Sequence, residues 1–276
     1  MNKLFVDLGY ASFYRFYATK TWYKFSHPEE DINSIVWEDN EEFMTKFEKI
    51  FIESLDIVRK SLNIDWKDII LAKDCSRNTI WRLQFYDQYK KTREAAQIKS
   101  GFNGHNVFRY ISKNIIPKLI KEYNVKVIKS ENAEADDIVA ALTKIFDKNN
   151  IYILANDTDY LQITSDKVHL IDFKCKERKC EDSKKELWSK ILGGDTSDNI
   201  PACKINQQLI YPTRNHRYIK CSKKIIKEIF NWEDWYEKIK MDNIIENNQQ
   251  ILNEKIISFD FIPTNILNDI YEKLNQ

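Results

Sequence analysis

Acidic residues that can bind metal ions recur in five short segments of the 276-residue chain. They are Asp7, Asp74, Glu134, Asp136, Asp137, Asp157, Asp159, Asp195 and Asp198. Two like charges about 4 Å apart repel by roughly 4 kcal/mol at an effective dielectric constant near 20, so converging carboxylates need counter-charge. Carboxylate oxygens favour magnesium or manganese over zinc, and the four histidines show no ligand spacing. Together with the basic segments described below, these acids predict a two-cation site that hydrolyses phosphodiesters.

Three of the aspartates follow short apolar runs, each of which predicts a buried strand. These runs are residues 4–6 before Asp7, 69–71 before Asp74 and 151–155 before Asp157, and a fourth strand is expected near 125–128. Segments with helical periodicity lie between them, which predicts an α/β fold with a mostly parallel central sheet flanked by helices. Because the carboxyl ends of parallel strands share one edge of the sheet, the three aspartates should share one crevice.

Each acidic segment also has an alternative explanation that involves no ligand. Aspartate is a good residue for leaving a strand or capping the next helix. Glu134 and Asp137 are three residues apart at the start of an apolar helical stripe, where acids also complement the helix dipole. Capping accounts for one of the three strand-end aspartates more easily than for all three together.

Charge is unevenly distributed along a chain whose formal net charge is only +1. Residues 203–227 hold seven basic and no acidic side chains, and residues 73–100 hold seven basic against three acidic ones. Residues 29–56 instead hold ten acids and two lysines. Basic segments with aromatic neighbours are typical of a polyanion-binding face, although a solvated helix surface explains either patch alone equally well.

The composition excludes several classes of protein. No run approaches the roughly 18 apolar residues of a membrane span, and the first residues lack the apolar core of a secretory signal, so we expect an intracellular protein. Five cysteines without a Cys-x-x-Cys pair indicate reduced thiols, not a disulfide framework or a zinc site. The five glycines cannot form a phosphate-binding loop or a dinucleotide fingerprint.

Five ordered motifs resemble the signatures of the 5′-nuclease family, which includes the flap endonucleases and the 5′-exonuclease domain of bacterial DNA polymerase I. They are VDLGYASFYR (6–15), D(x)6WRLQFYDQYKKTR (74–93), EADDIVA (134–140), ANDTDYLQI (155–163) and GDTSDNIP (194–201). Within the family, they are most similar to the ribonucleases H of T-even phages. The resemblance implies a PIN-like nuclease core over 1–185, with a helical arch at about 82–115. It also implies a helical, helix-turn-helix-like duplex-binding region with a C-terminal packing segment over 186–276.

The resemblance also assigns roles to individual residues. A first metal ion would be bound, directly or through water, by Asp7, Asp74, Glu134, Asp136 and Asp157. A second would be bound by Asp159, Asp195 and Asp198. Asp137 would either bind a metal ion or hold another ligand in place. Lys90 and Arg93 match the basic pair of the arch that stabilises the transition state. Arg15 and Arg82 match phosphate-contacting positions, and Tyr89 either stacks on a base or packs within the arch.

The basic segment after the last aspartates is expected to bind duplex phosphates. Its candidate contacts are Lys204, Arg214, Lys220, Lys223, Lys224 and Lys227. This segment lacks the glycine-rich turn that the family usually has there, so binding would depend on side chains, above all on the helix that carries Lys223, Lys224 and Lys227. A solvated helix face is the alternative.

The resemblance implies a 5′-3′ exonuclease and flap endonuclease with ribonuclease H activity, which removes RNA primers and 5′ flaps in lagging-strand replication. Two Mg²⁺ ions, replaceable by Mn²⁺, would be its cofactors, and flapped or nicked DNA and RNA–DNA hybrid its substrates. A monomer in the host cytoplasm of a phage is expected, with a single-strand-binding protein and a sliding clamp as family partners. The alternatives are a catalytically silent binder of branched DNA and a PIN-type ribonuclease.

Overall fold

The computed structural model describes residues 1–32, 34–93, 104–241 and 244–276. Within these residues, the chain divides into two compact units. Unit 1 is formed by residues 1–77, 102–179 and 264–276, and unit 2 by residues 78–101 and 180–263. Each unit is described by itself below.

Unit 1 is built on a five-stranded sheet. Its strands are β1 (Asn2–Asp7), β2 (Ile69–Lys73), β3 (Lys126–Lys129), β4 (Asn150–Leu154) and β5 (Val168–Ile171). Each pairs in parallel with its neighbours in the order β3-β2-β1-β4-β5, with Val6 opposite both Leu71 and Leu154. This arrangement confirms the predicted α/β class, and β5 is a strand that the sequence analysis did not predict.

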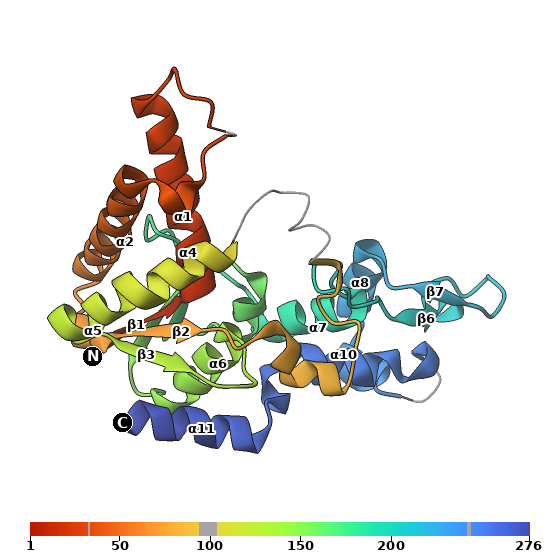
Figure 1. Cartoon of the computed structure of the whole chain (residues 1–276). Coiled ribbons are helices and arrows are strands. Elements are labelled where there is room, and N and C mark those ends of the chain that lie inside the picture. The colour runs from red at the N-terminus through yellow and green to blue at the C-terminus, as the bar shows by residue number, and fades with distance from the viewer. Residues whose placement is uncertain (33, 94–103, 242–243) are drawn as a thin grey trace. The chain divides into compact units, whose positions relative to one another are not determined.

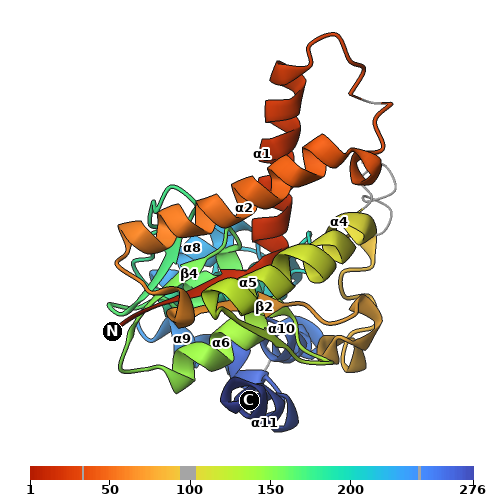
Figure 2. The same ribbon diagram turned by 60° about the vertical axis from the view of Figure 1, so that its left-hand side comes forward.

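Helices cover both faces of this sheet (Figures 1 and 2). One face carries α1 (Leu8–Ser26), α2 (Glu41–Ser61), α4 (Gly104–Tyr110) and α5 (Ile116–Tyr123), and the other carries α6 (Ala135–Ile145) and α11 (Thr264–Asn275). A π-helical segment, Ile111–Ile115, joins α4 to α5. Unit 1 is therefore a three-layer structure in which both faces of the sheet are buried, as a parallel sheet requires.

The alternation of side chains along β1 explains this packing. Leu4 and Val6 point toward the core shared with α1 and α2, whereas Phe5, between them, lies outside that cluster and contacts Phe146 after α6. All three side chains are fully buried. A short run that is apolar at every position thus supplies both faces of the central strand.

The strand order reverses between β1 and β4, the first and fourth strands of the chain. At such a switch point, the connections leave in opposite directions and open a crevice at the carboxyl ends of the strands, where α/β proteins bind ligands. Asp7 ends β1, and Asp157 follows β4 by three residues. The topology therefore brings two of the predicted acids to the two sides of this crevice.

Unit 2 contains helices α7 (Ser183–Gly193), α8 (Lys223–Phe230), α9 (Trp235–Ile239) and α10 (Gln249–Ile257). It also contains an antiparallel ribbon of β6 (Lys204–Asn206) and β7 (Tyr218–Lys220), which was not predicted from the sequence. The predicted basic helix is confirmed as α8, in which Ile225, Ile226 and Ile229 are buried.

The predicted division at residue 185 into a nuclease core and a duplex-binding region stays a prediction. Residues 94–103, in the predicted arch of about 82–115, lie outside the described residues. In the part of the chain that the structure describes, we find no helix that is both long enough and apolar enough to span a bilayer.

Candidate metal centre and nucleic-acid interface

Asp7 links the central strand to the first helix of unit 1. Its carboxylate caps α1 by accepting a hydrogen bond from the backbone N–H of Tyr10 at 2.9 Å, and its second oxygen accepts one from the Tyr160 hydroxyl at 3.0 Å. Burial raises the pKa of Asp7 from 3.8 to about 7, with the negative charges of Asp74 and Asp157 acting in the same direction and the two hydrogen bonds against it. The capping role is therefore real, but it does not compensate for burial and the neighbouring charges.

Asp74 lies beside Asp7 at the end of the neighbouring strand. A Cβ atom added at Gly9 would stand 3.2 Å from an oxygen of Asp7 and 3.3 Å from an oxygen of Asp74, so the two carboxylates approach the same glycine. The other oxygen of Asp74 accepts a hydrogen bond from the backbone N–H of Ala135 at 2.8 Å. Asp74 thereby joins β2 to the first turn of α6.

Three acids gather where α6 begins. Glu134 is the N-cap residue and forms a capping box with Asp137, whose carboxylate accepts the Glu134 backbone N–H at 3.0 Å. Glu134 and Asp137 are buried, with 6% and 0% of their surfaces exposed, and Asp136 is half-buried. One carboxylate oxygen from each of the three lies within 4.8 Å of the others, which is close enough to hold one cation.

Asp157 and Asp159 follow β4 at the same edge of the sheet. Asp157 caps the short 3-10 helix Thr158–Ile163 by accepting the backbone N–H of Asp159 at 2.9 Å. The fully buried Tyr160 lies in this helix, and its pKa is raised well above the ordinary value by burial and then by the charges of Asp7 and Asp136. Tyr160 thus stands among acids from three elements. Sequence reasoning missed it, although it directly follows Asp159.

This donor set fits a divalent cation. Asp7, Asp74, Asp136 and Asp157 are linked by the electrostatic interactions described above, and all of them offer carboxylate oxygens. Oxygen ligands of this kind suit hard cations such as Mg²⁺, Mn²⁺ or Ca²⁺. The raised pKa of Asp7 indicates that its negative charge is poorly compensated in the metal-free protein, and a bound cation would supply the missing positive charge.

We expect the stability of the metal-free protein to fall as the pH rises. Between about pH 4 and 7, the Asp7 carboxyl would be ionised in the unfolded chain but protonated in the folded one, so the folded state binds more protons and loses stability as the pH increases. A pKa raised from 3.8 to about 7 corresponds to a loss of up to about 4 kcal/mol. Urea unfolding in EDTA at pH 5.5 and pH 8 measures it, and D7N should flatten the dependence. An unchanged slope in D7N would contradict this origin.

Asp195 is held in a turn of unit 2 just after α7. One oxygen accepts hydrogen bonds from the Ser197 backbone at 2.8 Å and hydroxyl at 2.6 Å, and the other lies 3.6 Å from Lys190 Nζ. Burial alone would raise the pKa of Asp195, but the Ser197 hydrogen bonds and the Lys190 charge outweigh burial and lower it. The turn requires glycine at position 194, where φ is +68° and a Cβ would lie 2.4 Å from the Ile200 carbonyl oxygen.

Asp198 is buried and contacts three predicted site residues. Its side chain accepts a hydrogen bond from the Tyr89 hydroxyl at 3.1 Å, lies 3.5 Å from Lys90 Nζ and is paired with the Arg93 guanidinium. Only 4% of Asp198 is exposed. The backbone N–H of Lys90 also donates to the Asp198 carbonyl at 2.9 Å. The structure thus brings Asp198 together with Lys90 and Arg93, the two basic side chains for which a catalytic role is predicted.

Three predicted nucleic-acid contacts are at least partly enclosed. Tyr89 is 5% exposed, as its packing alternative requires, and Arg82 is 2% exposed with its Nε donating to the Ile256 carbonyl at 2.7 Å. Arg15 is half-buried, with its guanidinium 3.8 Å from the centre of the Phe173 ring. Phosphate contact by Arg82 would require its side chain to leave this position.

The predicted duplex-binding side chains of unit 2 are more accessible. Lys223, Lys224 and Lys227 are all exposed on α8. Lys204, Lys220 and Arg214 are exposed as well, and Lys204 forms an ion pair with Glu246 at 2.8 Å. The exposed face of α8 thus carries three lysines and one glutamate, Glu228, while the isoleucines are buried.

Comparisons with known proteins identify the class of molecule that has this fold and acidic edge. A model of the 5′-3′ exonuclease, N-terminal resolvase-like domain matches residues 4–191, which is more than half of the chain. The chain belongs to this family. The predicted relationship to the 5′ nucleases is thereby confirmed.

Individual relatives agree with this assignment. The chain is 26% identical to the ribonuclease H of enterobacteria phage T4 over 229 residues, which cover 79% of this chain and 73% of the phage protein. It is 27% identical to a 5′-3′ exonuclease of Buchnera aphidicola (subspecies Schizaphis graminum) over 150 residues, which are 50% of this chain and 49% of that protein. The chain thus matches about half the length of the Buchnera exonuclease.

Two solved structures of a phage T5 enzyme share the fold. The 5′-exonuclease with bound zinc superposes with a TM-score of 0.60 at 16% identity, covering 100% of this chain and 99% of that chain. The T5 flap endonuclease in a pseudo-enzyme–product complex with DNA and metal ions also gives 0.60 at 16% identity, covering 100% of both chains. At this identity, the likeness supports the fold alone.

Proposed function

We propose that the protein is a divalent-metal-dependent 5′-3′ exonuclease and flap endonuclease with ribonuclease H activity. Its substrates would be flapped or nicked DNA and RNA–DNA hybrids, and its role the removal of RNA primers and 5′ flaps during lagging-strand synthesis. The convergence of Asp7, Asp74, Asp136 and Asp157 at the switch point of the sheet carries this proposal. Family membership supports the choice of reaction.

Magnesium is the proposed cofactor, with two ions bound and manganese able to replace it. Asp7, Asp74, Glu134, Asp136 and Asp157 would hold the first ion, and Asp159, Asp195 and Asp198 the second, with Asp137 orienting Glu134 through the capping box. When bound, the ions would activate a water molecule and neutralise the leaving 3′ oxygen. The chain itself would orient the phosphate and supply Lys90 and Arg93 to stabilise charge in the transition state.

Two other functions are compatible with the same fold. A silent binder of branched DNA would be expected to have lost acids, yet none of the nine predicted positions lacks one. A PIN-type ribonuclease normally lacks a basic segment after the last aspartates, whereas this chain has the exposed lysines of α8 there. Both observations favour the 5′ nuclease.

The decisive experiment measures product lengths on labelled flap, nicked and hybrid substrates, with magnesium or with EDTA. We expect short products from the 5′ end and cleavage at the flap junction only in magnesium. Binding without cleavage on every substrate would indicate the silent binder. Cleavage of single-stranded RNA alone would indicate the PIN-type ribonuclease. Both outcomes would contradict the proposed function.

Replacing Lys223, Lys224 and Lys227 with alanine should weaken the binding of duplexes, whatever their base sequence. Removal of one phosphate interaction should reduce the slope of log affinity against log salt by about 0.9, so removal of three predicts a reduction of about 2.7. Fluorescence anisotropy from 50 to 200 mM salt measures both quantities. The control variant replaces three exposed lysines of unit 1 and changes the net charge by the same amount. These lysines are Lys121, Lys144 and Lys148. If the two triple variants had equal effects, the lysines of α8 would be a solvated helix face and not a duplex-binding site.

A further inference from the structure

Helix α1 carries aromatic side chains on both of its faces. Leu8, Ala11, Phe16 and Tyr23 belong to the buried core, as a helix that covers a sheet requires. The opposite face carries Phe13, Tyr14 and Tyr17, which are 40%, 40% and 48% exposed. Exposed aromatic groups of this size mark interaction surfaces more often than scattered apolar residues do. Packing within unit 1 therefore covers these three side chains only in part.

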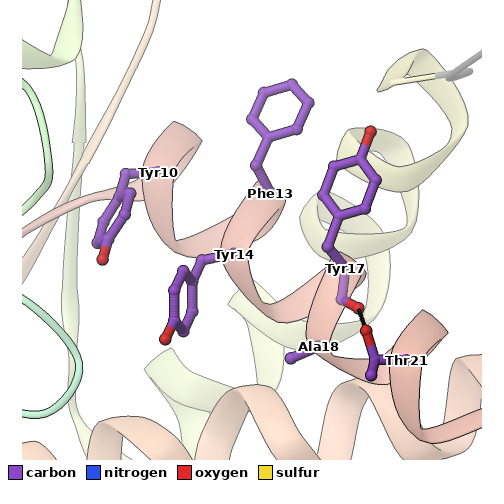
Figure 3. Close-up of a pocket in the computed structure, with 6 residues that line it drawn as sticks. All are labelled: Tyr10, Phe13, Tyr14, Tyr17, Ala18 and Thr21. Carbon is purple, nitrogen blue, oxygen red and sulfur yellow. Dashed lines mark hydrogen bonds between the residues drawn. The ribbon is translucent and has the colours of Figure 1, made fainter. Parts of the chain in front are cut away.

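These rings form a continuous surface along the helix. Figure 3 shows them projecting in two rows, Tyr10 with Tyr14 and Phe13 with Tyr17, each pair four residues apart. Together with Ala18 and Thr21, they line an open hollow of about 450 Å³. We call this surface, made of Tyr10, Phe13, Tyr14, Tyr17, Ala18 and Thr21, the aromatic stripe.

Neighbouring side chains hold several of the rings in place. Tyr14 stacks on Phe173 with ring centres 5.1 Å apart and an angle of 15°, and Phe13 meets Phe108 edge to face at 5.5 Å. The Arg15 guanidinium lies over both Phe173 and Tyr14. Rings that are already ordered lose little conformational freedom when a ligand stacks on them.

The charge of α1 indicates what kind of ligand the stripe fits. The helix contains Arg15, Lys20 and Lys24 but no aspartate or glutamate over its 19 residues. Among the described residues, the buried Nε of Arg15 makes no hydrogen bond. Aromatic rings combined with positive charge and no acid suit single-stranded nucleic acid, whose bases stack on the rings while cations meet the phosphates.

The position of the stripe points the same way. It begins one turn from Asp7, whose carboxylate accepts the Tyr10 backbone N–H, and runs away from the acidic edge. Seven residues separate Tyr10 from Tyr17, a rise of about 10 Å, which matches roughly three stacked nucleotides at about 3.4 Å each. A strand that leaves the acidic site would therefore meet the rings in succession.

We infer that the aromatic stripe binds unpaired nucleotides of the substrate, with Tyr14 and Tyr17 as base-stacking residues. The inference rests on the proposed nuclease function and adds a subsite for the single strand next to the acidic crevice. Stacking does not discriminate between bases, so the site should accept any sequence. Its occupant is single-stranded nucleic acid and not a protein segment.

Y17L tests the inference because it keeps an apolar side chain and removes the ring. In calcium, we expect about tenfold weaker binding of a duplex with a ten-nucleotide 5′ single strand, and unchanged binding of the same duplex without it. Y17F should bind both like the wild type. Y271L, which removes an exposed tyrosine from α11, is the matched control. Unchanged affinity of Y17L for the single-stranded arm, or an equal loss on both substrates, would overturn the proposal.

A second measurement uses the wild-type protein and therefore does not depend on the folding of a variant. We expect the fluorescence of 2-aminopurine placed in the single strand, within about three nucleotides of the junction, to be quenched on binding. Absence of quenching would contradict stacking. Failure of the nuclease proposal is distinguishable, since it would appear as a wild-type protein that cleaves no substrate, whatever Y17L binds.

Discussion

D157N should lower the rate of flap cleavage in magnesium by about 10³-fold, because the proposed mechanism assigns several kcal/mol of transition-state stabilisation to ions at the acidic edge. The fold should survive. An asparagine oxygen can still accept the Asp159 backbone N–H and cap the 3-10 helix, as Asp157 does. Single-turnover cleavage of a labelled 5′-flapped duplex measures the loss, and anisotropy in calcium should show that substrate binding is largely retained.

The chain offers a matched control for this variant. Asp166 is an exposed aspartate just before β5, at the amino end of the strand and so at the opposite edge of the sheet. D166N makes the same chemical change at the other edge of the same sheet, and this variant should cleave at the wild-type rate. If D157N also cleaved at the wild-type rate, the assignment of Asp157 to a metal ion would be wrong.

Removing Lys90 and Arg93 together should reduce single-turnover cleavage by about 10⁴-fold, since donors aimed at a developing charge are worth about 10²-fold or more each. Affinity for the substrate in calcium should change by less than about tenfold, because these interactions are expected to strengthen in the transition state. The measurement is cleavage rate against enzyme concentration, which separates binding from the chemical step. K91A changes the exposed lysine between them and should leave both quantities unchanged.

Folding must be checked in the double variant, because Asp198 is buried and would lose both cations. R93A alone removes the half-exposed partner and leaves Lys90 beside the carboxylate. It should melt close to the wild type and still cleave about 10²-fold more slowly. A double variant that is folded and cleaves normally would contradict the catalytic role of this pair.

The sequence was sufficient to predict the layered fold where patterns are local. Apolar runs ending in aspartate located β1, β2 and β4 to within a few residues, and lysines alternating with isoleucines located α8. The ribbon β6–β7 was missed because its strands have only three residues each and carry charged and polar side chains. Strand β5 was missed because the four residues of VHLI give too short a pattern.

The pairings within the site could be predicted less well than the residues in it. The hydroxyl of Tyr160 reaches Asp7 across 153 positions, and Tyr89 reaches Asp198 across 109. Such pairings depend on how strands and loops meet in three dimensions, for which spacing along the chain gives no signal. For the same reason, the grouping of Asp195 and Asp198 with the acids of unit 1 stays a prediction.

The position of β1 between β2 and β4 has a consequence for synthesis on the ribosome. The strand that carries Asp7 is made first, yet one of its two neighbours begins only at Asn150. At about 5–20 residues per second, translation from Asp7 to Asp157 takes roughly 8 to 30 s. A nascent chain therefore holds Asp7 without the acids that follow β4 for that interval, so the proposed metal centre cannot assemble before most of the polypeptide has emerged.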